Sequence, residues 1–229
     1  MSVGLNNLSV SRRTVADELF DAIRNDIDKM RLVPGTKITE TELAKLYNVS
    51  RQPVREAFIR LDNLSLLEIR PQKATIVRRI SKSAIQQARF VRVAVEVEVA
   101  RRACLVNKPE SIAALELILE QQSVCLKNKN IPKFNALDQE FHTQICLMAD
   151  CEFAVDVIAD CKAKVARLCI LSLANDSDAD KIYIDHIDIM RHLSNKDEDK
   201  LVQSIRDHLS RLDSTIEFIQ TEHRSYFED

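Results

Sequence analysis

The stretch that decides the fold of the first part of the chain is PGTKITETELAKLYNVSRQPVREAFIRLDNLSLLEIRPQKATIV, residues 34–77. Thr39 is placed to cap a short helix. Asn48-Val49 follows as a tight turn, and Ser50 is placed to cap the next helix. Two short helices joined by such a turn form a helix-turn-helix, whose second helix enters the major groove of DNA.

The second helix of this motif opens with side chains that suit DNA recognition. Arg51 and Arg55 lie one helical turn apart, so both can point at one strip of DNA. Gln52 and Pro53 lie at the same end of the helix. The planar fork of arginine pairs with guanine edges or with phosphate. The alternative is that these are surface arginines in intrahelical pairs, for instance with Glu56.

The residues after the second helix indicate a wing. Two short β-like runs, residues 67–70 and 75–78, flank a polar turn. Lys73, Arg78 and Arg79 lie where a wing could contact the DNA backbone or the minor groove.

The charge distribution favours DNA binding by the first part of the chain, and the low glycine content argues against a nucleotide-binding loop. Through Lys82 the chain has 15 Lys and Arg against 10 Asp and Glu, a net charge of +5, and the remainder has 18 against 25, a net of −7. A basic front indicates that only this part meets a polyanion, and we expect double-stranded DNA. With two glycines, Gly4 and Gly35, the chain has no glycine-rich phosphate loop and no dinucleotide fingerprint.

The rest of the chain has a helical pattern almost without interruption. We expect helices at approximately 81–106, 110–128, 131–149, 151–175, 178–194 and 197–222. Long helices joined by short turns pack as an antiparallel bundle. The expected fold is therefore mainly α. It has a winged helix-turn-helix in residues 1–79, whose first helix starts near Ser11, and a six-helix bundle in residues 80–229.

The cysteines indicate the compartment. All six lie in the helical part, at Cys104, Cys125, Cys146, Cys151, Cys161 and Cys169. No C-x-x-C pair and no signal peptide is present, which is typical of reduced, packed thiols in a cytoplasmic protein. No apolar run approaches the ~20 residues that cross a bilayer, so we expect no membrane partner.

Four residues of the bundle are candidate metal ligands. Asp138 and His142 lie one turn apart on the third expected helix, and His186 and His208 lie on the fifth and sixth. Three imidazoles and a carboxylate that converge in a bundle interior would suit a divalent metal ion such as Zn²⁺, Ni²⁺ or Mn²⁺. The alternative is that these are ordinary residues, because Asp-x-x-x-His occurs by chance and lone histidines are usually polar or core residues.

Residues 34–77 resemble, without gaps, the winged-helix domain of GntR-type regulators. The PG turn, the ETELA helix, the SRxPVREA helix and the EIRPQ wing occur in the same order. The resemblance implies that Arg51 and Arg55 contact bases and phosphates, with Gln52 and Pro53 beside them.

Two departures from the family concern glycine. The family often has glycine at the wing tip, where this chain has Lys73-Ala74, and at the end of the recognition helix, where this chain has Ser65. These departures affect the expected approach of the wing to the minor groove.

Three segments of the bundle, DQEFHTQI, DHIDIM and RDHLSRL, resemble the ligand-bearing segments of the FCD domain, which accompanies this winged helix in the FadR branch. The resemblance implies that Asp138, His142, His186 and His208 hold the metal. Six helices rather than seven are typical of the VanR-like subgroup.

The resemblance also suggests how an effector binds. In RFVRVAVEVEVARRA, which resembles the first FCD helix, Arg92 would face the effector cavity and neutralise an organic acid. Arg167 is a second candidate for this role. The alternative is an Arg92–Glu96 pair on the helix surface. The family often has asparagine where this chain has Cys151, which leaves the identity of the ligand open.

The sequence therefore predicts a transcriptional regulator, by family habit a repressor, and not an enzyme. A homodimer would bind an inverted repeat, and a small carboxylate effector at the metal site would change the orientation of the DNA-binding domains. Two alternatives are a DNA-binding module with a purely structural metal and a metal-dependent hydrolase. The effector, the metal and the operator stay open.

Overall fold

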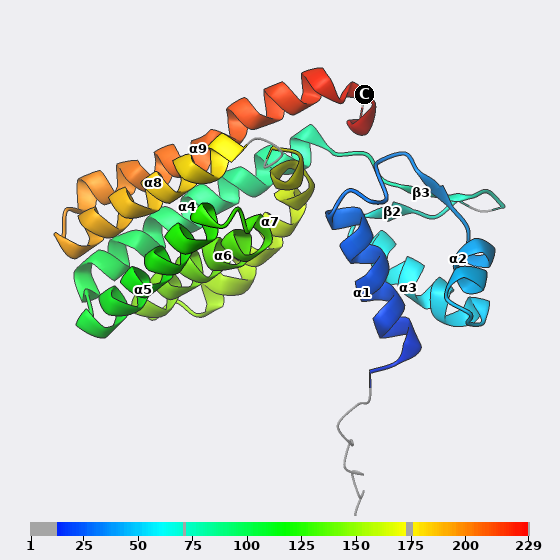
Figure 1. Cartoon of the computed structure of the whole chain (residues 1–229), viewed down its shortest axis with the longest axis horizontal. Helices are drawn as coiled ribbons and strands as arrows, with labels where there is room; N and C mark the ends of the chain where they lie inside the picture. Colours follow the sequence, from blue (N-terminus) through cyan, green and yellow to red (C-terminus); the bar gives the residue numbers. More distant parts are fainter. Residues whose placement is uncertain (1–12, 71, 173–175, 229) are drawn as a thin grey trace, which may run out of the picture. The chain divides into compact units, whose positions relative to one another are not determined.

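The computed structural model describes residues 13–70, 72–172 and 176–228, except for the side chains of 169, 170, 172, 176–178 and 212–215 (Figure 1). The chain divides into two compact units, Met1–Ile80 and Ser81–Asp229. This division falls one residue after the 79/80 boundary expected from the sequence. Each unit has its own hydrophobic core.

The described part of the first unit has three helices. They are α1 (Val15–Asp28), α2 (Glu40–Leu46) and α3 (Arg51–Asn63). Ser11, the expected cap of α1, lies outside the described residues, and the capping box is formed by Thr14 and Asp17 instead. The apolar faces of α1 and α3 pack together, with Ile27, Phe58 and Leu61 almost completely buried. Burial of each such side chain contributes about 1.5–3 kcal/mol.

A small antiparallel sheet completes this unit. Its strands are β1 (Lys37–Ile38), β2 (Leu67–Glu68) and β3 (Thr75–Val77), in the order β1-β3-β2. The wing strands β2 and β3 were expected, although β2 is shorter than the run predicted at 67–70. No sequence pattern predicted β1, which pairs Lys37 with Ile76.

Left-handed backbone occurs at one of the two places where the family often has glycine, Ser65, and at the residue just before the other, Gln72. Ser65, just after α3, has φ 57°, and Gln72, in the wing turn, also has φ 57°. Asn48, in the turn between α2 and α3, has φ 53°. This conformation places Cβ close to the backbone, and so it is strained for residues other than glycine. The turns are therefore made without glycine, at a cost in stability.

Within the residues described for the second unit there are six helices. They are α4 (Lys82–Val106), α5 (Pro109–Lys127), α6 (Ile131–Met148), α7 (Phe153–Ser172), α8 (Asp176–Ser194) and α9 (Glu198–Glu222), followed by the 3-10 turn Arg224–Tyr226. Every expected helix is present. The ends are shifted by at most two residues, apart from the end expected at residue 175, which lies outside the described residues. Helix α4 lies centrally, because it packs against α6, α7, α8 and α9.

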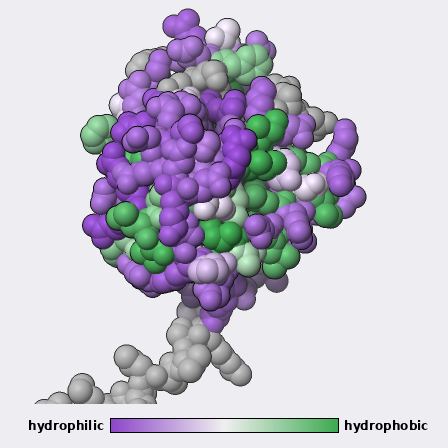
Figure 2. All heavy atoms as spheres, turned by 90° about the vertical axis from the view of Figure 1, so that its left-hand side faces the viewer, coloured by the Kyte–Doolittle hydropathy of each residue, from purple (hydrophilic) through white to green (hydrophobic). Residues whose placement is uncertain are grey.

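The second unit has a mostly hydrophilic face (Figure 2) and buried cysteines. The face seen in Figure 2 is mostly hydrophilic, with scattered hydrophobic side chains. Within the described residues, no helix has the length and apolar character needed to span a membrane. Five cysteines, at 104, 125, 146, 151 and 161, are buried and free. The side chain of Cys169 lies outside the description.

Candidate DNA-binding surface and metal centre

The start of α3 presents polar side chains to solvent. Ser50 is its N-cap residue, although its side chain makes no capping hydrogen bond. Arg51, Gln52 and Arg55 are exposed, and Pro53 is half-buried in the first turn. The expected DNA-contacting side chains therefore lie on one accessible end of the second helix of the motif.

Arg55 has a partner that was not predicted. Its Nε and Nη2 donate to the two carboxylate oxygens of Glu40 on α2, at 2.9 and 3.0 Å. This hydrogen bonding raises the pKa of Arg55 and lowers that of Glu40. The alternative was an intrahelical pair, for instance with Glu56; the bonds of Arg55 run instead to another helix, and Glu56 accepts from Gln52 at 2.9 Å. Glu40 holds the guanidinium in one orientation and leaves Nη1 for another acceptor.

Of the three cations expected to let the wing contact DNA, two are exposed and the third is bonded to the wing itself. Lys73 and Arg79 are exposed, as DNA contact would require. Arg78 instead donates from Nε to the carbonyl oxygen of Leu67 at 2.7 Å. Arg78 therefore stabilises the base of the wing.

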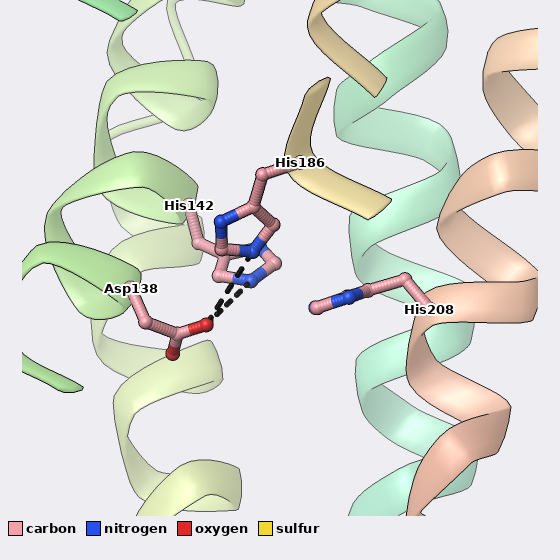
Figure 3. Close-up of side chains that lie close together, drawn as sticks. All are labelled: Asp138, His142, His186 and His208. Atoms are coloured by element: carbon pink, nitrogen blue, oxygen red, sulfur yellow. Dashed lines mark ion pairs between the residues drawn. The ribbon is translucent and has the colours of Figure 1, made fainter. Parts of the chain in front are cut away.

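The four candidate metal ligands lie together inside the second unit. Asp138 and His142 project from α6, His186 from α8 and His208 from α9 (Figure 3). One potential ligand atom from each lies within 4.8 Å of the others. Oδ1 of Asp138 lies 3.4 Å from Nε2 of His186 and 3.8 Å from Nε2 of His142.

Each imidazole has a second residue at its Nδ1. Glu96 on α4 lies 2.8 Å from Nδ1 of His142, and Gln122 Oε1 on α5 lies 3.0 Å from Nδ1 of His186. Asp185 lies 3.3 Å from Nδ1 of His208. Because these oxygens accept hydrogen bonds, each Nδ1 acts as the donor, and the Nε2 lone pairs are left for a metal ion.

The sequence did not predict the acceptors on Nδ1. Gln122 carried no signal, and Asp185 was visible only as the neighbour of His186 in DHIDIM. Arg211 holds Asp185 with two donated hydrogen bonds, one of them at 2.6 Å. Burial raises the pKa of Asp185, but the bonds from Arg211 and His208 lower it further, to about 2.

The protonation states also suit a metal ion. Burial lowers the pKa of His186 to about 3 and lowers that of His142 as well, so both imidazoles are neutral near pH 7. Burial acts against the charged form of Asp138, but Lys162 and the histidines hold its pKa well below the usual value. His142 and His186 therefore offer neutral nitrogens and Asp138 a carboxylate, as metal coordination requires.

Two buried nitrogens provide a test of the fit to a metal. Nε2 of His142 and Nε2 of His186 are buried and make no hydrogen bond. A buried polar atom without a partner costs about 1–3 kcal/mol. Ligands of one zinc-sized ion stand at most ~4.2 Å apart, so small side-chain movements would bring all four donors into reach. The residues fit a divalent ion.

The candidate effector residues differ in their surroundings. Arg92 donates from Nε to Glu96 at 2.7 Å, and both side chains are largely buried. The Arg92–Glu96 pair exists, but the expectation that it lies on the helix surface is wrong. Arg167 is buried on α7. One cavity beside His142, lined also by Glu96, Cys146 and Ile158, has a volume of about 10 Å³. That is about enough for one water molecule, so this cavity could take an organic acid only if its lining side chains moved.

Comparisons with known proteins agree with the two-unit architecture. The model of the bacterial regulatory proteins of the gntR family matches residues 15–77, and the FCD domain model matches 87–211. The HTH-type transcriptional repressor RspR of Escherichia coli (strain K12) is 34% identical over 215 residues, which cover 94% of each chain. The gluconate operon transcriptional repressor of Bacillus licheniformis is 24% identical over 91% of this chain and 87% of its own.

A solved structure shares the fold. That of E. coli McbR/YncC has a TM-score of 0.69 at 16% identity and covers 89% of this chain and 97% of its own. The related families are regulators and not enzymes, so the hydrolase alternative is set aside. The chain therefore belongs to the GntR family of bacterial regulatory proteins, with an FCD domain after its DNA-binding domain, and is a DNA-binding regulator of transcription.

Proposed function

We propose that this regulator is a repressor whose operator affinity is controlled by a small organic acid bound at a divalent metal ion in the FCD domain. The observation that carries the proposal is the cluster of Asp138 and three histidines, each histidine with an acceptor at Nδ1. Two relatives named as repressors favour repression over activation.

In the proposal, the start of α3 reads the operator. Arg51, Gln52, Pro53 and Arg55 would contact the major groove, and Lys73 and Arg79 would contact the backbone or minor groove. The accessibility of these side chains and the orientation of Arg55 by Glu40 support this assignment. The operator would be an inverted repeat, because a symmetric dimer presents two copies of α3.

A homodimer is part of the proposal. Phe90 and Leu105 on α4 and Phe153 on α7 are largely exposed, and α4 and α7 pack side by side. Exposed large apolar side chains on neighbouring helices are typical of an interface between subunits. Sedimentation of the purified chain tests the dimer.

Asp138, His142, His186 and His208 would hold the metal, and Zn²⁺, Ni²⁺ and Mn²⁺ are the candidates. The ion would supply open positions for an acid, and Arg92 and Arg167 would supply positive charge. The six helices of the described bundle favour the VanR-like subgroup.

Selection of bound fragments from the source genome by purified, metal-loaded protein tests the proposal. We expect a few sites that share a short inverted repeat, and loss of their binding in Arg55→Ala but not in Arg24→Ala, a control on α1. Operator affinity is then measured against added acids. Wild-type affinity in Arg55→Ala would remove α3 from recognition.

A second candidate function is a DNA-binding module whose metal is purely structural. The water-sized cavity beside His142 favours it. In that case, metal removal would lower stability, but no acid would change operator affinity.

A further inference from the structure

Lys162 on α7 contacts Asp138, the carboxylate among the four candidate metal ligands. Its ammonium forms an ion pair with Oδ2 of Asp138. The other oxygen, Oδ1, lies toward Nε2 of both His142 and His186. Figure 3 shows one carboxylate oxygen turned to these imidazoles and the other turned away from them. The two oxygens of Asp138 therefore have separate partners.

This contact lies at the accessible edge of the cluster. The side chains of His142, His186 and His208 are buried, whereas those of Asp138 and Lys162 are 19% and 20% exposed. A ligand that reaches the cluster from solvent along this edge meets Lys162 beside Asp138. An ammonium in such a place attracts an anion and repels a cation.

We propose that Lys162 has two linked roles in this regulator: it restricts Asp138 to metal binding through Oδ1, and it is the cationic contact for the carboxylate of the effector. The inference rests on the proposed metal-dependent function. It adds to Arg92 and Arg167 a residue that touches the ligand cluster directly.

The positive charge of Lys162 should weaken the binding of a metal ion and strengthen the binding of an anion. With Lys162 in place, a divalent ion binds close to a positive charge, so its affinity is lower than the four ligands alone would give. An anion at the same edge is attracted by both charges and offsets their repulsion. Metal and anion therefore strengthen each other's binding, and by linkage the effect is reciprocal. Lys162 makes the metal-bound state depend on the acid.

The test uses full-length Lys162→Met protein, with Lys164→Met as the matched control. Lys164 lies two residues further along α7 and is exposed. Cobalt(II) affinity is measured by competition with a chelating indicator. The cobalt-loaded proteins are then titrated with acetate, and the visible absorption of Co²⁺ reports anion binding.

We expect Lys162→Met to bind Co²⁺ about tenfold more tightly and acetate about tenfold more weakly than wild type. Lys164→Met should match wild type in both, and Lys162→Arg should keep acetate binding because it keeps the charge. Weaker binding of both ligands in Lys162→Met would mean a structural role and would overturn the proposal. Unchanged affinities would also overturn it.

The wild-type protein separates this inference from the function on which it rests. If wild type binds no Co²⁺, the proposed metal site fails and the role of Lys162 fails with it. If wild type binds Co²⁺ but its spectrum does not respond to acetate, the metal site stands and the anion contact is refuted.

Discussion

Replacement of Glu96 by glutamine should destabilise the second unit by about 3 kcal/mol. Glu96 is only 4% exposed, and its carboxylate accepts from Nε of Arg92 at 2.7 Å and lies 2.8 Å from Nδ1 of His142. Glutamine has nearly the same shape, so the change removes the charge and leaves the packing. Arg92, which is largely buried, then loses the charge of this partner.

The loss of about 3 kcal/mol follows from the hydrogen bonds of Glu96 and, separately, from the cost of breaking a buried ion pair. Hydrogen bonds to a charged group contribute about 1.5–3 kcal/mol each, and glutamine retains one neutral acceptor worth about 1 kcal/mol. The loss from two bonds is then roughly 2–5 kcal/mol. Removal of one partner from a buried ion pair costs about 3–5 kcal/mol, and the remaining exposure of Arg92 favours the lower end.

The loss should depend on pH in a defined direction. Burial raises the pKa of Glu96, but Arg92 and His142 lower it more, so its pKa in the folded state lies below the ordinary 4.5. A carboxyl with a depressed folded pKa stabilises the protein above its unfolded pKa and loses this effect as the pH falls. The difference between wild type and Glu96→Gln should therefore be full at pH 7 and shrink below pH 4.5.

Urea denaturation of EDTA-treated proteins, followed by far-ultraviolet circular dichroism, measures this difference. Glu98→Gln is the matched control. Glu98 lies two residues along α4, is 56% exposed and forms only surface ion pairs, so its loss should cost less than about 0.5 kcal/mol. A Glu96→Gln protein within 0.5 kcal/mol of wild type at pH 7 would refute the reasoning.

Three further predictions follow from the geometry. His186→Ala should lower metal content and thermal stability together, and unchanged metal stoichiometry by elemental analysis would remove His186 from the site. Metal-free wild type should lose stability as the pH falls below about 6.5, because the unfolded histidine binds a proton that the folded one, with a pKa of about 3, does not. This slope, from denaturation curves at several pH values, should flatten in His186→Gln, and an identical slope would contradict the cause. Ser65→Gly should raise the stability of the first unit by about 0.5 kcal/mol, since it relieves a left-handed residue but increases the freedom of the unfolded chain. A lower melting temperature would count against this.

Local signals explain how much of the fold could be predicted. Thr39 caps α2, and Ser50 precedes α3, as the side-chain pattern indicated. The bundle helices end at short turns that are rich in polar residues, so their ends could be predicted from the sequence. Strand β1 could not be found, because two residues give no periodicity and their pairing with β3 depends on a partner far along the chain.

The site was predictable only in part, for a similar reason. Asp138 and His142 share a helix face, so their proximity follows from spacing. The contacts of Gln122 and Lys162 run between helices, and no sequence pattern shows which residues face each other there. The same holds for Glu40 and Arg55, which lie on different helices.

Every helix of the bundle contributes a residue to the cluster or its partners. These are Glu96 on α4, Gln122 on α5, Asp138 and His142 on α6, Lys162 on α7, His186 on α8 and His208 on α9. Contacts between such distant parts of a chain form late in folding, because they must overcome loop-closure entropy. A partly folded bundle would thus offer no complete site. A bound ion would stabilise only the finished protein, by about 2.7 kcal/mol at a hundredfold excess over its dissociation constant. The supply of metal would then set how much of the newly made regulator survives proteolysis.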